Sequence, residues 1–240
     1  MRIYGRKILK EALDSKVKIK KVYFAELENP SGEFLKLIER VKNAGIPYKF
    51  VSKKKADNLV SGEKSQGVVI DLEEFSYLDI HDALEKFENP FVILLDRIQD
   101  PHNFGAIVRT AVASGADFIV IPKDRSVKVT PAVVKVSAGY VFRIPIVIVT
   151  NMARTVDLLK GHGIWVYAAS AGGKTYYKMD LKKPVGVVFG NEGKGIRRLV
   201  LEKCDGVISI PMKNGVESLN VAVSAGIIMY EVWRQNESKS

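Results

Sequence analysis

The chain has 240 residues, 47% of them hydrophobic, and 37 basic against 27 acidic side chains give it a net charge of +10. The hydrophobic share suffices for a sizeable core, yet no apolar run approaches the roughly 18 residues of a membrane span, and the first residues lack a secretory signal. The single cysteine, Cys204, excludes an internal disulfide and a cysteine-rich zinc site, and the three histidines lack metal-ligand spacing. We therefore expect a soluble, cytoplasmic protein without a bound metal.

The charge is unevenly distributed along the chain. Residues 1–70 carry a net charge of +8, residues 71–88 carry −6 and residues 89–240 carry +8. Two basic blocks separated by an acidic stretch predict a domain over 1–70, a linker over 71–88 and a second domain over 89–240. Basic excess favours a polyanionic partner such as nucleic acid, although a solvated lysine-rich surface accounts for it equally well.

The first 70 residues alternate between helical and strand patterns. Apolar side chains recur at helical spacing over 6–13 and 33–43, and Gly45 is a stop signal for the second helix. Strands are expected at 21–25, 47–51 and 68–70. These elements predict a small αβ sandwich. In the stretch that follows, the spacing of apolar residues over 80–87 is compatible with a short amphipathic helix.

From residue 91 onward, apolar strands alternate with helical patterns. Several strands are continuous apolar runs, which are typical of strands buried on both faces of a parallel sheet. The alternation therefore predicts an α/β domain whose sheet is covered by helices on both faces. Strands are expected at 91–95, 118–121, 146–149, 164–167, 185–189 and 207–210, and helices at 103–114, 131–138, 153–160, 197–203 and 218–235.

Three strand ends of this domain carry unusual residues, and ligands of α/β sheets bind at such ends. After the first strand, Asn103 is placed to cap a helix and Arg109 lies within an otherwise small and apolar helix. A helix cap and a snorkelling arginine would account for both residues without any site. The segment 168–172, at another strand end, is a weaker candidate.

The second unusual strand end, over 189–195, is rich in glycine and contains Glu192. It is neither the dinucleotide fingerprint nor a Walker loop, so a phosphate cradle of those types is not supported. A tight turn is the alternative. The third end, over 210–220, joins a strand to the last helix, with Ser218 as the N-cap candidate and Asn220 in the first turn.

Other catalytic candidates lack the necessary pattern. No Gly-x-Ser-x-Gly nucleophile elbow is present, Cys204 has no nearby histidine and is expected to be structural, and His102 is expected to form local hydrogen bonds. The lysine clusters at 16–21 and 53–55 fit either contacts with a polyanion or a solvated face.

Taken together, the three strand ends resemble the three motifs of the SpoU/TrmH family of SPOUT methyltransferases, and the match spans about 90–236. The N-terminal 70 residues resemble the L30e-like RNA-binding domain of the subfamily that methylates guanosine in 23S rRNA, with Ser65-Gln66-Gly67 in place of a His-Gln-Gly sequence. Motif one corresponds to Asn103, Gly105, Arg109, Thr110 and Ala111, motif two to Gly190, Glu192 and Gly195, and motif three to Ile210–Met212, Ser218–Val221 and Gly226.

The resemblance implies transfer of a methyl group from S-adenosylmethionine to a ribose 2′-OH of RNA. The target that it favours is a guanosine of 23S rRNA. It also implies a deep trefoil knot in the C-terminal domain, a homodimer packed through that region, and no membrane or DNA partner. The residues it implies for binding the methyl donor are Gly190, Ile210 and Leu219. Those it implies for catalysis are Arg109, Asn103, Glu192, Ser218 and Asn220.

Three other functions compete with this interpretation. A tRNA 2′-O-methyltransferase of the same family would share the site but differ in substrate, and the N-terminal domain argues against it. A noncatalytic RNA-binding protein would have no need of the intact motif residues. A nucleotide-binding oxidoreductase fits the βαβ alternation but lacks the phosphate fingerprint.

Overall fold

The computed structural model describes residues 1–237, which form two compact units. The first unit contains residues 1–76 and 129–143, and the second contains residues 77–128 and the chain from Ile144 onward. The break at 76/77 lies inside the predicted linker, 71–88.

A four-stranded sheet organises the first unit. The strand order is β1-β4-β2-β3, with β2 and β3 parallel and the other neighbours antiparallel. Its elements are β1 (Arg2–Tyr4), α1 (Arg6–Asp14), β2 (Ile19–Ala25), α2 (Gly32–Asn43), β3 (Tyr48–Val51), α3 (Lys53–Asn58), β4 (Val68–Leu72), α6 (Pro131–Val136) and the 3-10 turn η1 (Tyr140–Phe142). The predicted strands and helices are confirmed, while β1 and α3 are additional.

Helix α3 begins in the lysine cluster and was missed because three lysines show no apolar periodicity. Ser52 caps it, since the Ser52 hydroxyl accepts a hydrogen bond from the backbone N–H of Lys55 at 3.3 Å. The buried side chain of Ala56 holds the helix to the sheet beside Ala25, Val51 and Val69.

Segment 129–143 lies between strands of the second unit in sequence but packs within the first. Arg143 Nε donates to the buried carboxylate of Glu11 at 2.5 Å, and Lys135 Nζ lies 3.0 Å from Glu63. At Gly139, where φ is +85°, a Cβ would lie 2.9 Å from the Glu11 side chain. The helical pattern over 131–138 carried no information about which sheet the helix covers.

The Ser65-Gln66-Gly67 sequence forms a tight turn before β4. Buried Ser65 donates its hydroxyl to Asp57 at 2.6 Å, and its oxygen accepts from the N–H of Gly67 at 3.2 Å. Gln66 and Gly67 both have positive φ. The hydrogen bonds from Ser65 lower the pKa of Asp57.

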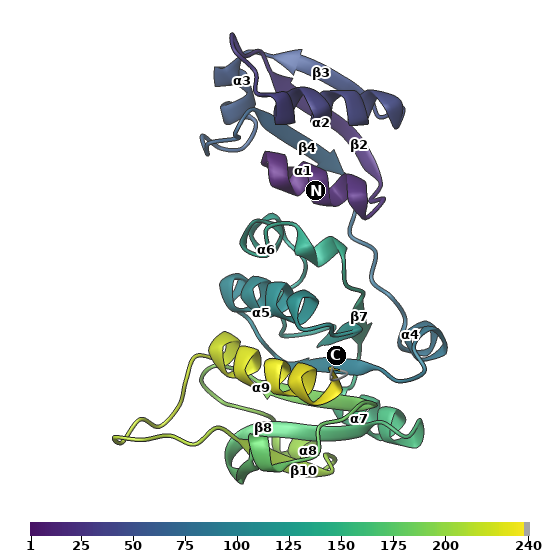
Figure 1. Ribbon diagram of the computed structural model, residues 1–240, viewed down its shortest axis with the longest axis vertical. Helices are drawn as coiled ribbons and strands as arrows, with labels where there is room; N and C mark the ends of the chain where they lie inside the picture. The colour runs from purple at the N-terminus through teal and green to yellow at the C-terminus, as the bar shows by residue number, and fades with distance from the viewer. Residues whose placement is uncertain (238–240) are drawn as a thin grey trace. The chain divides into compact units, whose positions relative to one another are not determined.

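Six parallel strands form the sheet of the second unit, as predicted, in the order β10-β8-β9-β5-β6-β7 (Figure 1). Central β5 is fully buried. The elements are α4 (Ile80–Lys86), β5 (Phe91–Asp96), α5 (Pro101–Ala113), β6 (Phe118–Pro122), β7 (Ile146–Val149), α7 (Met152–Gly161), β8 (Trp165–Thr175), η2 (Tyr176–Lys178), β9 (Val185–Gly190), α8 (Arg198–Leu201), β10 (Gly206–Ser209) and α9 (Val221–Asn236).

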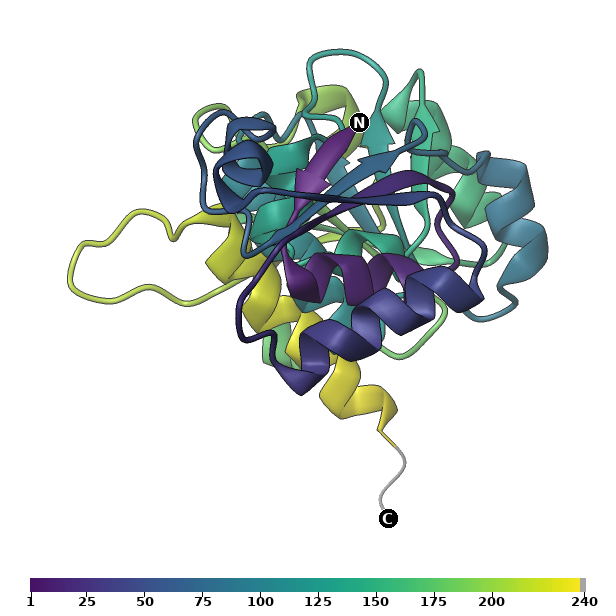
Figure 2. The same cartoon turned by 90° about the horizontal axis from the view of Figure 1, so that it is seen from above.

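Helices cover both faces of this sheet. On one face, α4, α7 and α8 bury Ile80, Val156 and Val200 against strand residues. Helices α5 and α9 lie side by side on the other face (Figures 1 and 2). They approach closely where Gly226 of α9 faces Thr110 of α5, and a Cβ at Gly226 would lie 3.7 Å from the Thr110 methyl.

Two predicted helix caps were wrong. Asp100 caps α5 by accepting the N–H of His102 at 2.9 Å, so Asn103 lies inside the first turn rather than at the cap. Asn220 caps α9 by accepting the N–H of Ala222 at 2.9 Å, and Ser218 lies before the helix. In both cases an Asp or Asn with an equally good cap side chain stood nearby in the sequence.

Within residues 1–237, no helix is long and apolar enough to cross a bilayer. The same residues contain no group of three or more His, Cys, Asp and Glu side chains arranged to hold a metal ion.

Candidate functional site

The three singled-out segments meet at the carboxyl edge of the parallel sheet. Strands β5 and β9 are neighbours, so the turns that follow Asp96 and Gly190 leave the sheet side by side. The third segment, 210–220, runs from the edge strand β10 to the start of α9, and it extends away from the sheet in both views (Figures 1 and 2).

Asn103 joins the three segments through its side-chain amide. Its Nδ2 donates to Glu192 Oε1 at 2.8 Å, and its Oδ1 accepts from Asn220 Nδ2 at 3.0 Å. Asn103 is 9% exposed, and both ends of its amide are used. We call this arrangement of Asn103, Glu192 and Asn220 the amide bridge. It ties together residues 89 and 117 positions apart in the sequence.

The glycine-rich turn over 190–196 is shaped by close backbone contact. A Cβ on Gly190 would lie 2.2 Å from the carbonyl carbon of Gly195, so only glycine fits where the turn folds over the strand end. Asn191 and Gly195 exchange backbone hydrogen bonds of 3.1 and 2.9 Å. The Asn191 side chain accepts from the N–H of Gly193 and donates to the carbonyl of Arg97, at 3.0 Å each.

A buried ion pair fixes the far end of this turn. Asp96, fully buried at the end of β5, accepts from the backbone N–H of Arg197 at 3.0 Å and from its guanidinium Nη2 at 2.6 Å. A buried carboxylate requires such a partner, because an unpaired charge would be costly to desolvate. The pair therefore holds the turn against the neighbouring strand.

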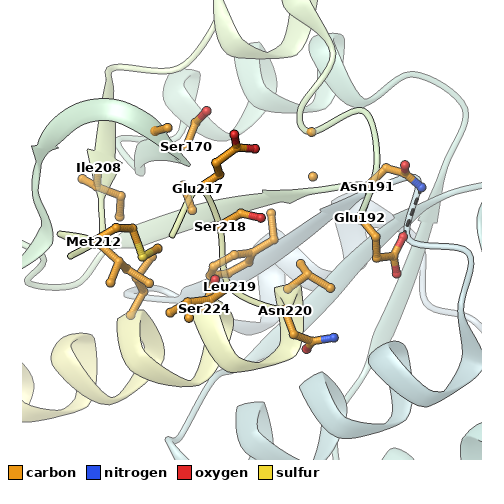
Figure 3. Close-up of a pocket in the computed structure, with 18 of the residues that line it drawn as sticks. Ser170, Asn191, Glu192, Ile208, Met212, Glu217, Ser218, Leu219, Asn220 and Ser224 are labelled. Carbon is orange, nitrogen blue, oxygen red and sulfur yellow. Dashed lines mark hydrogen bonds between the residues drawn. The ribbon is translucent and has the colours of Figure 1, made fainter. Parts of the chain in front are cut away.

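A pocket of about 510 Å³ lies between the glycine-rich turn and segment 210–220. Glu217 and Ser218 lie on one side of it, and Asn191 and Glu192 on the other (Figure 3). It is lined by Ala169, Ser170, Ala171, Phe189, Gly190, Asn191, Glu192, Gly193, Gly195, Ile208, Ile210, Met212, Glu217, Ser218, Leu219, Asn220, Val221, Ser224 and Ile228.

The charge of this pocket is opposite to that of the chain. Its lining contains two carboxylates, Glu192 and Glu217, but no lysine or arginine among the described residues, although the chain carries a net charge of +10. Apolar side chains such as Phe189 and Leu219 supply much of the remaining wall. The pocket therefore suits a small ligand with apolar parts and a positive charge, rather than a phosphate-bearing one.

Most predicted site residues are brought together here, and one is not. All three predicted donor-binding residues line the pocket, as do three of the predicted catalytic residues. Asn103 lies behind the lining. Arg109 is exposed on α5, does not line the pocket, and forms no side-chain hydrogen bond or ion pair within residues 1–237. The predicted donor-binding residues that line the pocket are Gly190, Ile210 and Leu219, and the predicted catalytic residues that line it are Glu192, Ser218 and Asn220.

Sequence reasoning missed three residues that shape the site: Asp96, Asn191 and Arg197. An acidic residue closing a fully apolar strand was the available signal for Asp96, because it must find a partner once buried. Nothing in the sequence indicated that the partner follows the glycine-rich turn.

Cys204 plays a structural part outside the pocket. Its thiol donates to the carbonyl of Val200 at 3.3 Å. Burial, helped by the charge of Asp205, raises the pKa of Cys204 to about 12, so the thiolate that nucleophilic chemistry needs is scarce.

A parallel α/β sheet with a small-molecule pocket at the carboxyl ends of its strands is typical of α/β enzymes, which bind their ligands at this edge of the sheet. Residues 90–230 match the model of the SpoU rRNA methylase family, and residues 2–78 match a model described as RNA 2′-O ribose methyltransferase substrate binding. The chain belongs to the SpoU rRNA methylase family, which confirms the resemblance drawn from the three motifs.

Relatives align over nearly the whole chain. YacO of Bacillus subtilis, whose name places it provisionally among TrmH family tRNA/rRNA methyltransferases, is 43% identical over 238 residues, 97% of this chain and 95% of that one. The 23S rRNA (guanosine-2′-O-)-methyltransferase RlmB of Coxiella burnetii is 40% identical, covering 98% and 96%. An AdoMet-bound rRNA methyltransferase from Sinorhizobium meliloti superposes with a TM-score of 0.85 at 28% identity, covering 99% and 88%.

Proposed function

We propose that this enzyme transfers a methyl group from S-adenosylmethionine to a ribose 2′-hydroxyl of RNA, with a guanosine of 23S rRNA as its target. The observation that carries the proposal is the pocket between the second and third motif segments, whose described lining contains carboxylates and no basic side chain. Asn103 of the first motif segment is hydrogen-bonded to two of the lining residues, Glu192 and Asn220. The Coxiella relative is named for this reaction, and the Sinorhizobium structure contains this methyl donor.

The pocket fits the methyl donor chemically. Its volume lies in the range of about 300–1,000 Å³ for small-molecule sites. Apolar walls suit the adenine ring, and the carboxylates of Glu192 and Glu217 suit the positive sulfonium and ammonium groups. A dinucleotide would bring a pyrophosphate into a pocket without a cation, which argues against the oxidoreductase alternative.

When bound, the donor supplies an electrophilic methyl carbon whose bond to sulfur breaks as the bond to the ribose oxygen forms. The ribose oxygen loses its proton and must approach in line with the breaking bond. Alignment of two reactants contributes several kcal/mol to such a displacement. We assign this alignment to the turns at 190–196 and 210–220, which the amide bridge holds together.

The roles of individual residues follow from where they lie. Gly190, Ile210 and Leu219 would hold the donor, and Glu192, Ser218 and Asn220 face the same space. Asn103 is a positioning residue, because both ends of its amide are occupied by protein groups.

Arg109 is assigned to the RNA. Its exposed guanidinium is free to bind a phosphate in bidentate fashion and to polarise the 2′-hydroxyl. A guanidinium holds its proton strongly and is a poor base, so we assign Arg109 to orienting and polarising the 2′-hydroxyl rather than to accepting its proton.

The protein's setting completes the proposal. We place it in the cytoplasm with its RNA, as a homodimer formed through the exposed apolar face of α9, and with a trefoil knot in the second unit. A tRNA substrate is the alternative that the name of YacO keeps open. We favour rRNA, because the Coxiella relative, which is named for a 23S rRNA reaction, aligns with 98% of this chain and not with the methylase region alone.

Calorimetry with S-adenosylmethionine and with NAD tests the pocket. The methyl donor should bind and NAD should not; binding of NAD alone would overturn the proposal.

Arg109→Ala should leave donor binding within about twofold while abolishing methyl transfer to RNA. Undiminished turnover in this variant would remove Arg109 from the mechanism.

A further inference from the structure

Two aromatic side chains are exposed on the edge strand of the first unit. Tyr48 and Phe50 of β3 are 37% and 43% exposed. Strand β3 lies at the edge of this sheet, and among the described strands it pairs with β2 alone. Because side chains alternate along a strand, these two residues lie on the same face of the sheet. Exposure of two neighbouring aromatic rings on a basic unit calls for an explanation.

The rings are held in a fixed arrangement. Their centroids lie 5.9 Å apart at an interplanar angle of 88°. Fully buried Phe24, on the adjacent strand, supports both, with centroid distances of 6.3 Å to Tyr48 and 6.1 Å to Phe50. Phe34 of α2 packs edge-on against Phe24 at 5.6 Å. A cluster of aromatic rings in edge-on and tilted contact therefore connects the exposed pair to the core, and little side-chain freedom remains to be lost on binding.

Positive charge lies beside the pair. Lys42 at the end of α2 places its Nζ 5.9 Å from the Tyr48 ring centroid. Lys49, between the two aromatic residues, is exposed on the opposite face of the strand, and the three lysines of α3 follow β3 directly in the sequence. Residues 1–70 carry a net charge of +8. Aromatic faces combined with lysines suit unpaired bases and their phosphates.

We propose that Tyr48 and Phe50 form a stacking platform for unpaired bases of the RNA, with Lys42 contacting the backbone of the same strand. The inference deepens the proposed function, on which it rests, by naming the surface and the kind of nucleotide it reads. The platform binds looped or single-stranded RNA, since the bases of a regular duplex are not available for stacking on protein rings. A protein partner is the competing occupant, and the surrounding positive charge favours RNA.

The test uses the full chain and a 16-nucleotide RNA of mixed sequence that contains 2-aminopurine, alongside its matched duplex. Tyr48→Ala and Phe50→Ala should each weaken single-strand binding at least about fivefold and reduce the quenching of 2-aminopurine. Binding of the duplex should stay unchanged. Lys42→Ala should make the negative slope of log affinity against log salt concentration less steep by about 0.7, because one phosphate contact is lost.

Matched variants separate stacking from folding. Phe50→Trp should retain binding, because it keeps an aromatic face, and Tyr177→Ala, which removes a 53%-exposed aromatic from the second unit, should have no effect. Should the alanine variants not fold, the native protein still decides: failure to quench 2-aminopurine at saturation overturns the platform.

Three results would contradict the proposal: native affinity in both alanine variants, equal weakening for duplex and single strand, or a change in oligomeric state without loss of RNA binding. The assay contains no methyl donor. Failure of the proposed function would instead appear as absent methyl transfer with RNA binding intact, so the two failures are distinguishable.

Discussion

Asn103 shows how one amide can organise a site assembled from distant parts of the chain. A buried amide has two donors and an acceptor, and here it donates to Glu192 and accepts from Asn220. Alanine at position 103 would remove both hydrogen bonds. An aspartate there would destabilise the site further, because its carboxylate would face the like charge of Glu192.

Asn103→Asp is therefore expected to lower the free energy of unfolding by about 1–3 kcal/mol and to weaken binding of the methyl donor. The repulsion raises the pKa of one carboxyl, so the defect should be present at neutral pH and relieved as the pH falls and that group takes up a proton. Thermal unfolding and calorimetry across pH measure both effects. Asn29→Asp, on an exposed loop, is the matched control and should change neither. If Asn103→Asp changed neither the stability nor the binding of the methyl donor, the amide bridge would be dispensable.

Cys204 gives a second prediction at this scale. With its pKa raised to about 12, very little thiolate exists at pH 8, whereas a free cysteine with a pKa of ~8.5 is partly ionised. The thiol should therefore react slowly with a disulfide reagent at pH 8 in the native protein, and immediately in guanidinium chloride. Rapid labelling of the native protein would contradict the structural role of this half-buried thiol.

Residue types and spacing predicted most of the lining, but not every role. Glu192 was singled out because a carboxylate between glycines is unusual for a turn, whereas the site role of Asn220 came from the resemblance of its segment to motif three. Asn103 was taken for a cap, because sequence does not show that Asp100 reaches the free N–H groups first. The Asp96–Arg197 pair spans 101 positions, and no local pattern joins such residues.

At the scale of elements, the glycine-rich turn after β9 carries the tightest steric requirement in the site. Gly190→Ala would place a Cβ 2.2 Å from the Gly195 carbonyl carbon, so the turn must shift. We expect a loss of about 1–3 kcal/mol in unfolding free energy and at least a tenfold loss in affinity for the methyl donor.

Gly161→Ala provides the control for this prediction. Gly161 ends α7, and no atom lies within 4 Å of the Cβ that alanine would add. This variant should be neutral or slightly stabilising, since alanine restricts the unfolded chain. Native affinity for the donor in Gly190→Ala would show that the turn does not contribute to the pocket.

The predictability of elements followed the strength of their patterns. The apolar runs of β5, β6 and β9 predicted a parallel sheet correctly, because only a strand buried on both faces tolerates such runs. Three-residue β1 and lysine-rich α3 offered no pattern to detect. Helix α6 was predicted in place, but its membership of the first unit depends on contacts such as that of Lys135 with Glu63.

At the scale of the whole molecule, the outer face of α9 predicts self-association. Val223, Tyr230 and Trp233 recur at helical spacing and are 51%, 47% and 40% exposed, whereas Ile228 on the inner face is buried. The native protein should sediment as a dimer at micromolar concentration, and Trp233→Glu should yield monomers. Trp165→Glu, at an exposed position on β8, should leave the dimer intact. A monomeric native protein would contradict the dimer.

The most direct test of the central claim is mass spectrometry of rRNA that lacks this modification, after incubation with the purified protein and isotopically labelled S-adenosylmethionine. We predict one labelled methyl group on the ribose 2′-oxygen of a guanosine in 23S rRNA. A label on a base, or no label although the methyl donor binds, would contradict the account.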